Sequence, residues 1–337
     1  MSLPSPERVS LPSLKDIVLI LVEYTNRWAL EKLISQCPVL ENVSIDRIYG
    51  DGMPILRVCS QSLLSFMHYW DKNDDYEKDR IVEIDAPMLK CLRISDGGTA
   101  SFIIKNQPSL VEADIDTVFS LTTERWLRVA NEIQTRDMVR DFHVGISKVK
   151  DLTIASSTLE VIYDYARYVQ LPIFRNLYTL CVRFDSYMWE MLPVCPNLKT
   201  LVVPAGLING WVDTAARLKV EHLDVSDSFS EWDPMMNPTV LYTCSNLVSL
   251  RLVGMGLPNP ERVSLPSLKT LVLILIEFTN KWALENLISK CPVLENFCFE
   301  TSYDDGIPIL CVHSKSLLTF MHDAGYHEDC DEEDRFV

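Results

Sequence analysis

The sequence has no long apolar run, few histidines and none of the common nucleotide-binding or catalytic motifs. Its longest apolar runs, Ile17–Val22 and Leu271–Ile276, have six residues each, whereas a membrane-spanning helix needs about 20. The N-terminus lacks the apolar stretch of a secretory signal peptide. G-x-G-x-x-G, G-x-x-x-x-G-K-[ST], H-E-x-x-H and G-x-S-x-G are all missing. We therefore expect no transmembrane helix, no secretory leader and no enzyme.

Basic residues are also scarce relative to acidic ones. The 31 Lys and Arg residues stand against 47 Asp and Glu residues, which gives a formal net charge of −16. Such a surface repels phosphate backbones and anionic lipids, so we expect neither nucleic acid nor a membrane as a partner. The hydrophobic fraction of 47% is ample for a folded core and excludes a disordered chain.

The ten cysteines do not have the setting of a secreted disulfide framework, because no signal peptide precedes them. Four of them, Cys37, Cys195, Cys244 and Cys291, each stand three residues before a leucine that opens a predicted strand. A small side chain that is readily buried suits such a position. This pattern predicts reduced thiols in an intracellular protein, either cytoplasmic or nuclear.

What the sequence does contain is a repeat of the form L-x-x-L-x-L, whose spaced apolar residues suit the inward side of a short strand. From Leu14 to Leu268 there are ten intervals over 254 residues, or about 25 residues each, which is typical of leucine-rich repeats. The repeats open at Leu14, Leu40, Leu89, Leu110, Val149, Leu177, Leu198, Val220, Leu247, Leu268 and Leu294, with weaker members at Leu64 and Leu318.

Between these strands the apolar spacing changes to that of helices. Trp28–Gln36, with Asn26 as the N-cap, and Thr122–Thr135 each carry an apolar face at a period of 3.6 residues. The sequence therefore predicts an α/β leucine-rich-repeat solenoid of about thirteen units over residues 1–337. We expect a right-handed horseshoe segment, with parallel strands on the concave face and helices on the convex face.

A second repeat lies on top of the first. Residues 1–68 align without gaps on residues 255–322, and 47 of the 68 positions are identical. The identity includes pairs such as Glu31 and Glu285, which are not part of the apolar skeleton. Ordinary neighbouring repeats share only that skeleton, so the two segments are interpreted as copies of the same stretch of one array.

The alignment places Met1 opposite Met255, within a continuous array, and Asp334–Val337 opposite Asp79–Val82, which leads into another strand. We interpret the chain as a window on a longer solenoid, produced by a gene rearrangement or an imprecise gene prediction. A natural short array without its flanks is the alternative.

Several phrases resemble the plant F-box/LRR-repeat family, whose members often carry a C-terminal FBD domain. The phrases are Ser10–Lys15, Leu33–Asn42, Ala86–Ile94, Val149–Val161 and Cys195–Leu201, and the resemblance covers essentially the whole chain. In that family an N-terminal F-box docks on the Skp adaptor of a cullin ubiquitin ligase, and the LRR region is thought to select the substrate.

The resemblance implies a non-catalytic protein-binding region, similar to the substrate-recognition region of an SCF-type receptor. The residues before Leu14 leave no room for an F-box, and the chain ends before an FBD domain could begin, so direct binding of the Skp adaptor is not expected. Two alternatives stay open. The chain is a truncated or rearranged gene remnant without function, or it is a free-standing LRR competitor that binds a substrate without recruiting the ligase.

A metal site was considered at His322, His327 and Cys330. In the first copy the positions of the last two hold Asn73 and Tyr76, so the set is not kept between copies. We therefore expect no metal, no cofactor and no catalytic residue. The acidic clusters at 71–79 and 328–334 are interpreted as exposed turns that keep the chain soluble.

The binding surface is predicted on the concave face, from side chains that alternate with the buried apolar residues of each strand. This face is mixed but mostly acidic, which favours an unknown protein substrate with a basic patch; a merely solvated face is the alternative. The predicted residues are Glu41, Asp46, Arg93, Glu112, Asp114, Asp116, Tyr178, Arg183, Glu221, Asp224, Glu295 and Glu300.

Four apolar residues interrupt this polar face: Val18 and Ile20, and their counterparts Val272 and Ile274 in the second copy. We expect a loop to cover them, which would make them ordinary core residues; an exposed adhesive patch is the alternative.

Overall fold

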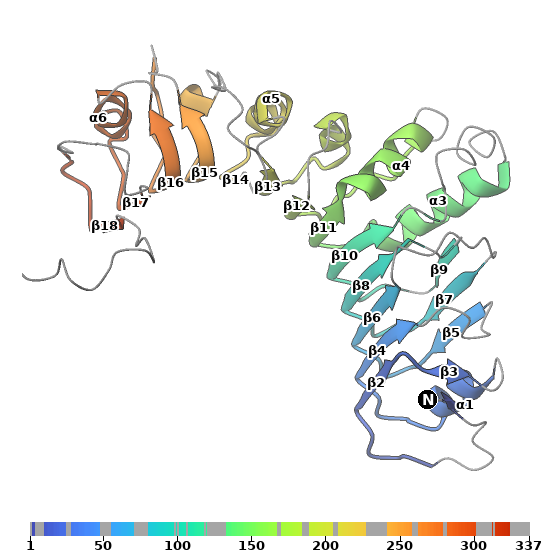
Figure 1. Ribbon diagram of the computed structural model, residues 1–337. Coiled ribbons are helices and arrows are strands. Elements are labelled where there is room, and N and C mark those ends of the chain that lie inside the picture. Colours follow the sequence, from blue (N-terminus) through green and yellow to red (C-terminus); the bar gives the residue numbers. More distant parts are fainter. Residues whose placement is uncertain are drawn as a thin grey trace, which may run out of the picture. The chain divides into compact units, whose positions relative to one another are not determined.

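The computed structural model describes residues 2–3, 10–24, 28–47, 55–70, 80–97, 99, 101–105, 107–117, 119, 133–166, 170–183, 189–204, 208–226, 241–257, 262–278, 282–300, 312 and 314–323. The chain divides into two compact units, Met1–Asn197 and Leu198–Val337, and each is described by itself (Figure 1).

Unit 1 is built on an inner sheet of parallel strands. Each strand pairs with the strand of the next repeat, and the L-x-x-L-x-L segments supply them as predicted. In spatial order the strands are β2 (Asp16–Ile20), β4 (Asn42–Arg47), β6 (Ser65–Trp70), β8 (Cys91–Asp96), β10 (Glu112–Thr117), β11 (Asp151–Ala155) and β12 (Thr179–Arg183). A separate short parallel pair is formed by β1 (Ser2–Leu3), which precedes β2 in the sequence, and β3 (Glu23–Tyr24), which follows it.

A regular hydrogen-bond ladder holds the repeats in register. The carbonyl of Lys15, just before β2, accepts from the backbone N–H groups of Glu41 and Asn42 at 2.8 and 2.9 Å. The carbonyl of Glu41 accepts in the same way from Leu64 and Ser65 at 2.8 and 3.0 Å. Each repeat thus provides hydrogen-bond acceptors for backbone N–H groups of the next repeat, and these bonds hold consecutive parallel strands in register.

The core lies behind the inner sheet, on the side of the repeat leucines. Along β4, Val43 and Ile45 have 1% and 0% of their surface exposed, while the residues between them face the other way. Phe66 and Phe102 are also fully enclosed. The alternation of strand side chains therefore separates one buried face from one open face.

The outer layer of unit 1 is only partly helical, which corrects the expectation that helices line the whole convex face. Helix α1 (Ala29–Ser35) is followed by a parallel three-stranded sheet, and only later by α3 (Ile133–Ile146) and α4 (Ser156–Ala166). The sheet consists of β5 (Ile55–Cys59), β7 (Ile81–Asp85) and β9 (Ser101–Lys105). Buried and half-buried side chains alternate along β5 and β7, with a period of two that a helix cannot use.

The predicted helix at Trp28–Gln36 is confirmed as α1, with one correction at its start. The N-cap residue is Trp28, not Asn26, and it makes no side-chain capping bond. Most of the predicted helix Thr122–Thr135 lies outside the described residues, and α3 begins at Ile133.

Unit 2 repeats the same design. Its strands are parallel in the order β13 (Thr200–Pro204), β14 (His222–Ser226), β15 (Ser249–Leu257), β16 (Thr270–Phe278), β17 (Asn296–Glu300) and β18 (Thr319–Asp323). Its helices are α5 (Ile208–Leu218) and α6 (Trp282–Ser289), and short 3₁₀ turns occur at η3 (Leu241–Thr243) and, in unit 1, at η1 (Trp189–Val194). The division of the whole chain into about thirteen units of one array stays a prediction.

The two duplicated segments form the same local contacts. The Cys37 thiol donates to the Leu33 carbonyl at 3.2 Å, and the Cys291 thiol donates to the matching carbonyl of Leu287 at 3.2 Å. The hydroxyls of Ser62 and Ser316 each donate to the leucine carbonyl of the preceding repeat at 2.8 Å.

Leu21 and Leu275 share an uncommon backbone conformation, with φ of 50° in both copies. In β16 this residue breaks the strict alternation of a strand. Leu275 is 45% exposed, whereas Leu273 before it and Ile276 after it are buried at 0% and 2%. With this left-handed residue in the run Leu271–Ile276, three of its six apolar residues, Leu271, Leu273 and Ile276, are buried.

No helix in the part of the chain that the structure describes is long and apolar enough to cross a membrane.

Candidate functional site

The open face of the inner sheet in unit 1 is the candidate site. We define this open face as the side chains at the first, third and fifth positions of its strands, which point away from the core. Parallel register places the third-position residues in one row, and the fifth-position residues in the next. The first of these rows holds Val18, Ser44, Met67, Arg93, Asp114 and Thr153, and the second holds Ile20, Asp46, Tyr69, Ser95, Asp116 and Ala155.

The predicted charges of this face are largely paired with one another. Arg183 on β12 reaches across β11 to form an ion pair with Asp114 on β10. Between them β11 offers only the small side chains of Thr153 and Ala155, which leave room for the arginine. Arg93 approaches Glu112 at 3.5 Å. These part-exposed pairs contribute little to stability, but they remove free charge from the surface.

Three more predicted carboxylates lie just before a strand, and each meets a lysine from the preceding repeat. Lys15 lies 2.7 Å from Glu41, and Lys269 lies 2.9 Å from the matching Glu295. Lys199 and Glu221 form the third pair. The hydrogen bond and charge of Glu41 raise the pKa of Lys15 above its ordinary value.

In unit 2, Arg251 on β15 lies 3.0 and 3.3 Å from the two carboxylate oxygens of Asp224 on β14. Six of the nine predicted carboxylates therefore hold a cation of the same chain. Of the other three, Asp46 and Glu300 are half-buried on their strands, and Asp116 is only 8% exposed, with the Ser157 hydroxyl at 3.5 Å. Pairing across the repeats therefore neutralises most of the acidic charge on the predicted mixed face, and its role in binding stays a prediction.

The apolar residues on the open face are exposed, so the expectation that a loop covers them is wrong for the first copy. Val18 and Ile20 each have 63% of their surface exposed. Their neighbours on β4, Ser44 and Asp46, are too short to cover them. Two strands further, Tyr69 is 38% exposed, and its hydroxyl contacts the sulfur of Met67 at 3.9 Å.

The second copy differs at these positions. Val272 and Ile274 are half-buried on β16, which has a neighbouring strand on each side. The two copies therefore present different apolar surfaces in spite of their similar sequences.

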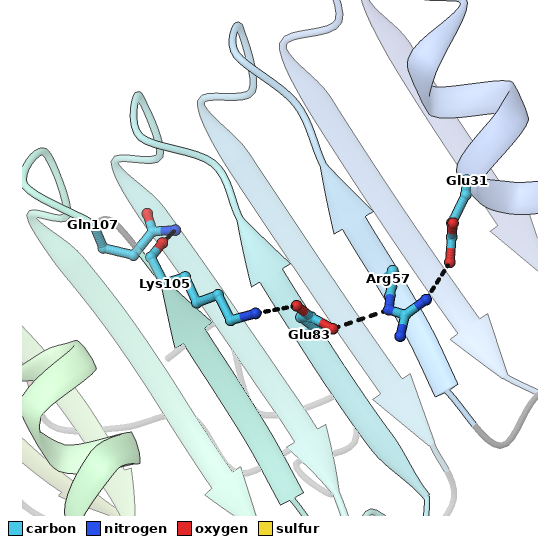
Figure 2. A network of polar contacts seen from close by, with 5 residues as sticks. All are labelled: Glu31, Arg57, Glu83, Lys105 and Gln107. Atoms are coloured by element: carbon cyan, nitrogen blue, oxygen red, sulfur yellow. Dashed lines mark hydrogen bonds and ion pairs between the residues drawn. The ribbon is translucent and has the colours of Figure 1, made fainter.

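The outer sheet of unit 1 carries charges that are closed into a network (Figure 2). Glu83 on β7 accepts from Arg57 on β5 at 2.9 Å and also pairs with Lys105 on β9. Arg57 also approaches Glu31 of α1 at 3.5 Å, and the Gln107 amide donates to the Lys105 carbonyl at 2.8 Å. The hydrogen bond from Lys105 is the largest of several effects that hold the pKa of Glu83 below its ordinary value. This outer surface has little unpaired charge to offer a partner.

The described residues contain no group of three or more His, Cys, Asp and Glu side chains that could hold a metal. His322 is exposed on β18, while His327, Cys330 and both acidic clusters at 71–79 and 328–334 lie outside the described residues. Burial raises the pKa of the Cys195 and Cys291 thiols to about 12, as expected for packing residues rather than nucleophiles.

Comparison with known proteins agrees with this architecture. A family model described as "FBD-associated F-box protein At5g56370, LRR repeats" matches residues 2–113 and 208–335. F-box/FBD/LRR-repeat protein At1g78750 of Arabidopsis thaliana is 56% identical over 207 residues, which are 60% of this chain and 45% of that protein. F-box/LRR-repeat protein 13 of the same plant is 51% identical over 207 residues, or 60% of this chain and 46% of that protein.

The chain thus matches slightly less than half the length of these relatives. The family model, by contrast, covers well over half of the chain. This protein belongs to the leucine-rich-repeat family of the FBD-associated F-box proteins.

Proposed function

We propose that this chain is a non-catalytic protein-binding scaffold, which serves as the substrate-recognition region of an F-box-type ubiquitin-ligase receptor. Its relatives are named F-box and LRR-repeat proteins. Its described residues form a sheet whose charged side chains are mostly ion-paired with one another, which favours a binding surface over a reactive centre. A sheet whose backbone is held in register across repeats can present side chains at fixed spacings, which suits recognition of another protein.

The observation that carries the proposal is the exposure of apolar and aromatic side chains on the open face of unit 1. Val18 and Ile20 on β2 each expose 63% of their surface, and Tyr69, two strands away on β6, exposes 38%. The ion pairs Arg93–Glu112 and Arg183–Asp114 lie further along the same face. Protein interfaces combine an apolar, aromatic centre with a polar rim, and tyrosine is frequent among the residues that dominate binding energy.

The test replaces Val18 and Ile20 with serine in the full chain and compares the proteins captured by proximity labelling in plant cells. The matched control is Val272→Ser/Ile274→Ser, which makes the same chemical change at the duplicated positions. We expect the first variant to lose its captured partners and the control to keep them, with the Skp adaptor scored separately. Retention of all partners by Val18→Ser/Ile20→Ser would overturn the proposal.

A further inference from the structure

A row of residues just before the strands of unit 1 carries charge in an unusual arrangement. We define this strand-start row by the backbone ladder, in which each member donates its N–H to the carbonyl of the one before. Lys90 donates to Leu64 at 2.8 Å, Val111 to Lys90 at 2.9 Å, Lys150 to Val111 at 2.8 Å and Tyr178 to Lys150 at 2.7 Å. These residues are therefore immediate neighbours across consecutive repeats.

At the matching strand-start positions elsewhere in unit 1 and in unit 2, a lysine is followed by a glutamate, and the two neutralise each other. This happens at Lys15 and Glu41, at Lys199 and Glu221, and at Lys269 and Glu295. The lysines at 90 and 150 are followed instead by valine and tyrosine. Among the residues that the structure describes, neither of these two lysines has a carboxylate oxygen within 4 Å.

Further unpaired cations lie beside this part of the row. Lys148 and Arg175 are both exposed, and the Asn176 side chain between their repeats donates to the Lys148 carbonyl at 3.3 Å. Two acidic residues directly follow members of the row in the sequence: Glu112, which lies 3.5 Å from Arg93, and the exposed Asp151. The described residues of the strand-start row and its neighbours therefore carry an excess of positive charge, although the net charge of the chain is −16.

Two non-charged residues complete the strip. Tyr178 is 50% exposed and Val111 is 37% exposed. Neighbouring strands lie about 4.8 Å apart, so the four positions from Lys90 to Tyr178 span about 14 Å, the length of roughly four or five extended residues. Cations therefore alternate with an aliphatic and an aromatic side chain over the length of a short peptide.

We propose that this strip, consisting of Lys90, Val111, Lys150 and Tyr178 with Lys148 and Arg175 beside it, binds an extended acidic segment of a partner protein. Carboxylates of that segment pair with the lysines, and its apolar side chains contact Val111 and Tyr178. The proposal rests on the proposed protein-binding function and adds the chemistry of the partner. It differs from the sequence-based expectation of a partner with a basic patch, because six of the nine carboxylates behind that expectation hold cations of the same chain.

A matched pair of variants in the full chain tests the strip. Lys90→Gln/Lys150→Gln removes the two uncompensated charges, whereas Lys15→Gln/Lys269→Gln removes two charges that are paired with glutamate at strand-start positions of unit 1 and unit 2. Both variants change the net charge equally, so any difference between them is local. The side chains of Lys90 and Lys150 are exposed, so both variants are expected to fold, and circular dichroism serves as the check on folding.

The probe is a fluorescein-labelled peptide of about twelve residues, made of Glu and Asp with one central Phe, and binding is measured by fluorescence anisotropy. We expect Lys90→Gln/Lys150→Gln to weaken binding roughly tenfold or more, and Lys15→Gln/Lys269→Gln to change it by less than about twofold. Binding also weakens as salt is raised.

Three results would overturn the inference: no binding of the acidic peptide, equal losses in both variants, or tighter binding of a single-stranded oligothymidylate than of the peptide. The last result would assign the strip to nucleic acid. The Val18→Ser/Ile20→Ser capture experiment reads the proposed function separately. If that variant loses its partners while Lys90→Gln/Lys150→Gln still binds the peptide normally, only the strip inference fails; if neither surface affects any protein partner, the proposed function fails.

Discussion

His68 on β6 and Asp96 on β8 form a fully buried pair, with 2.7 Å between Nε2 and Oδ2 and no exposed side-chain surface on either residue. Asp96 also accepts hydrogen bonds from the backbone N–H and the hydroxyl of Thr99, at 2.8 and 2.5 Å. Burial alone would raise the pKa of Asp96, but the bonds from His68 and Thr99 hold it below its ordinary value. The pair therefore links two consecutive repeats through the core.

Replacing one partner of this pair is expected to destabilise unit 1 strongly. Asp96→Ala or His68→Leu removes one member and leaves the other buried, which costs about 3–5 kcal/mol. The double variant His68→Leu/Asp96→Leu is expected to cost less than either single change, because no buried charge is left alone. Urea unfolding followed by circular dichroism measures this, and a single variant as stable as the wild type would contradict the expectation.

His143 in α3 gives a prediction about pH. It is buried, its Nδ1 donates to the Val139 carbonyl at 2.7 Å, and burial lowers its pKa from 6.5 to about 4. The unfolded chain therefore takes up a proton at a higher pH than the folded chain does. The free energy of unfolding should fall as pH drops from about 6.5 towards 4, by on the order of 3 kcal/mol.

The control for this pH effect is His222, which is only half-buried on the open face of β14. His143→Gln should remove most of the decline between pH 6.5 and 4, whereas His222→Gln should retain it. An unchanged pH profile in His143→Gln would refute the assignment. The contribution of Asp96 lies in a lower window, because its lowered pKa stabilises the fold above about pH 4 and is lost only as pH falls further.

Gly145 in α3 is expected to resist replacement by alanine. A Cβ at this position would lie 2.8 Å from Cβ of Ile104 on β9, which is closer than atoms can pack. Alanine normally favours a helix over glycine by about 1 kcal/mol, but here we expect Gly145→Ala to destabilise the fold by about 1–3 kcal/mol. Val144→Ala, at a neighbouring residue that is 54% exposed, should shift stability by less than about 0.5 kcal/mol.

The cysteines should differ sharply in reactivity. Burial raises the pKa of Cys195 and Cys291 to about 12. A thiol with such a pKa is about one part in 10,000 thiolate at pH 8. Partial burial and nearby carboxylates also raise the pKa of Cys59 at the end of β5, but this residue is exposed, so a reagent can reach its thiol. Brief alkylation of the native protein, read by peptide mass spectrometry, should label Cys59 well before Cys195 and Cys291. Equal labelling would argue against the packing described here, and denatured protein provides the control.

The inner strands could be predicted because their apolar spacing is local and repeats many times. Leu40, Val43 and Ile45 fit the pattern, and all three are buried at 1% exposure or less. The outer strands β5, β7 and β9 were not predicted, because the segments between the inner strands were expected to be helical. Leu56 and Val58 on β5 do alternate with less buried residues. However, a segment of five residues is too short for this period of two to distinguish a strand from a helix without the neighbouring strands.

The pairing of the predicted face could not be foreseen from composition. Lys15 and Glu41 are 26 residues apart, and they meet only because the strands pair in register. A comparison of the residue before each strand in consecutive repeats would have found this signal. The exposure of Val18 and Ile20 had no local signal, because it depends on the short neighbours that the register brings beside them.

Site-specific photo-crosslinking tests most directly whether the protein binds its partners through the open face. A photoreactive phenylalanine is placed at Tyr69 on the open face, or at Ile103 on the outer sheet, two residues with matched exposures of 38% and 37%. In plant cell extract, we expect discrete adducts with a partner protein from position 69 and none from position 103. Adducts of equal yield from both positions, or from position 103 alone, would contradict the claim that this protein binds its partners through the open face of the sheet.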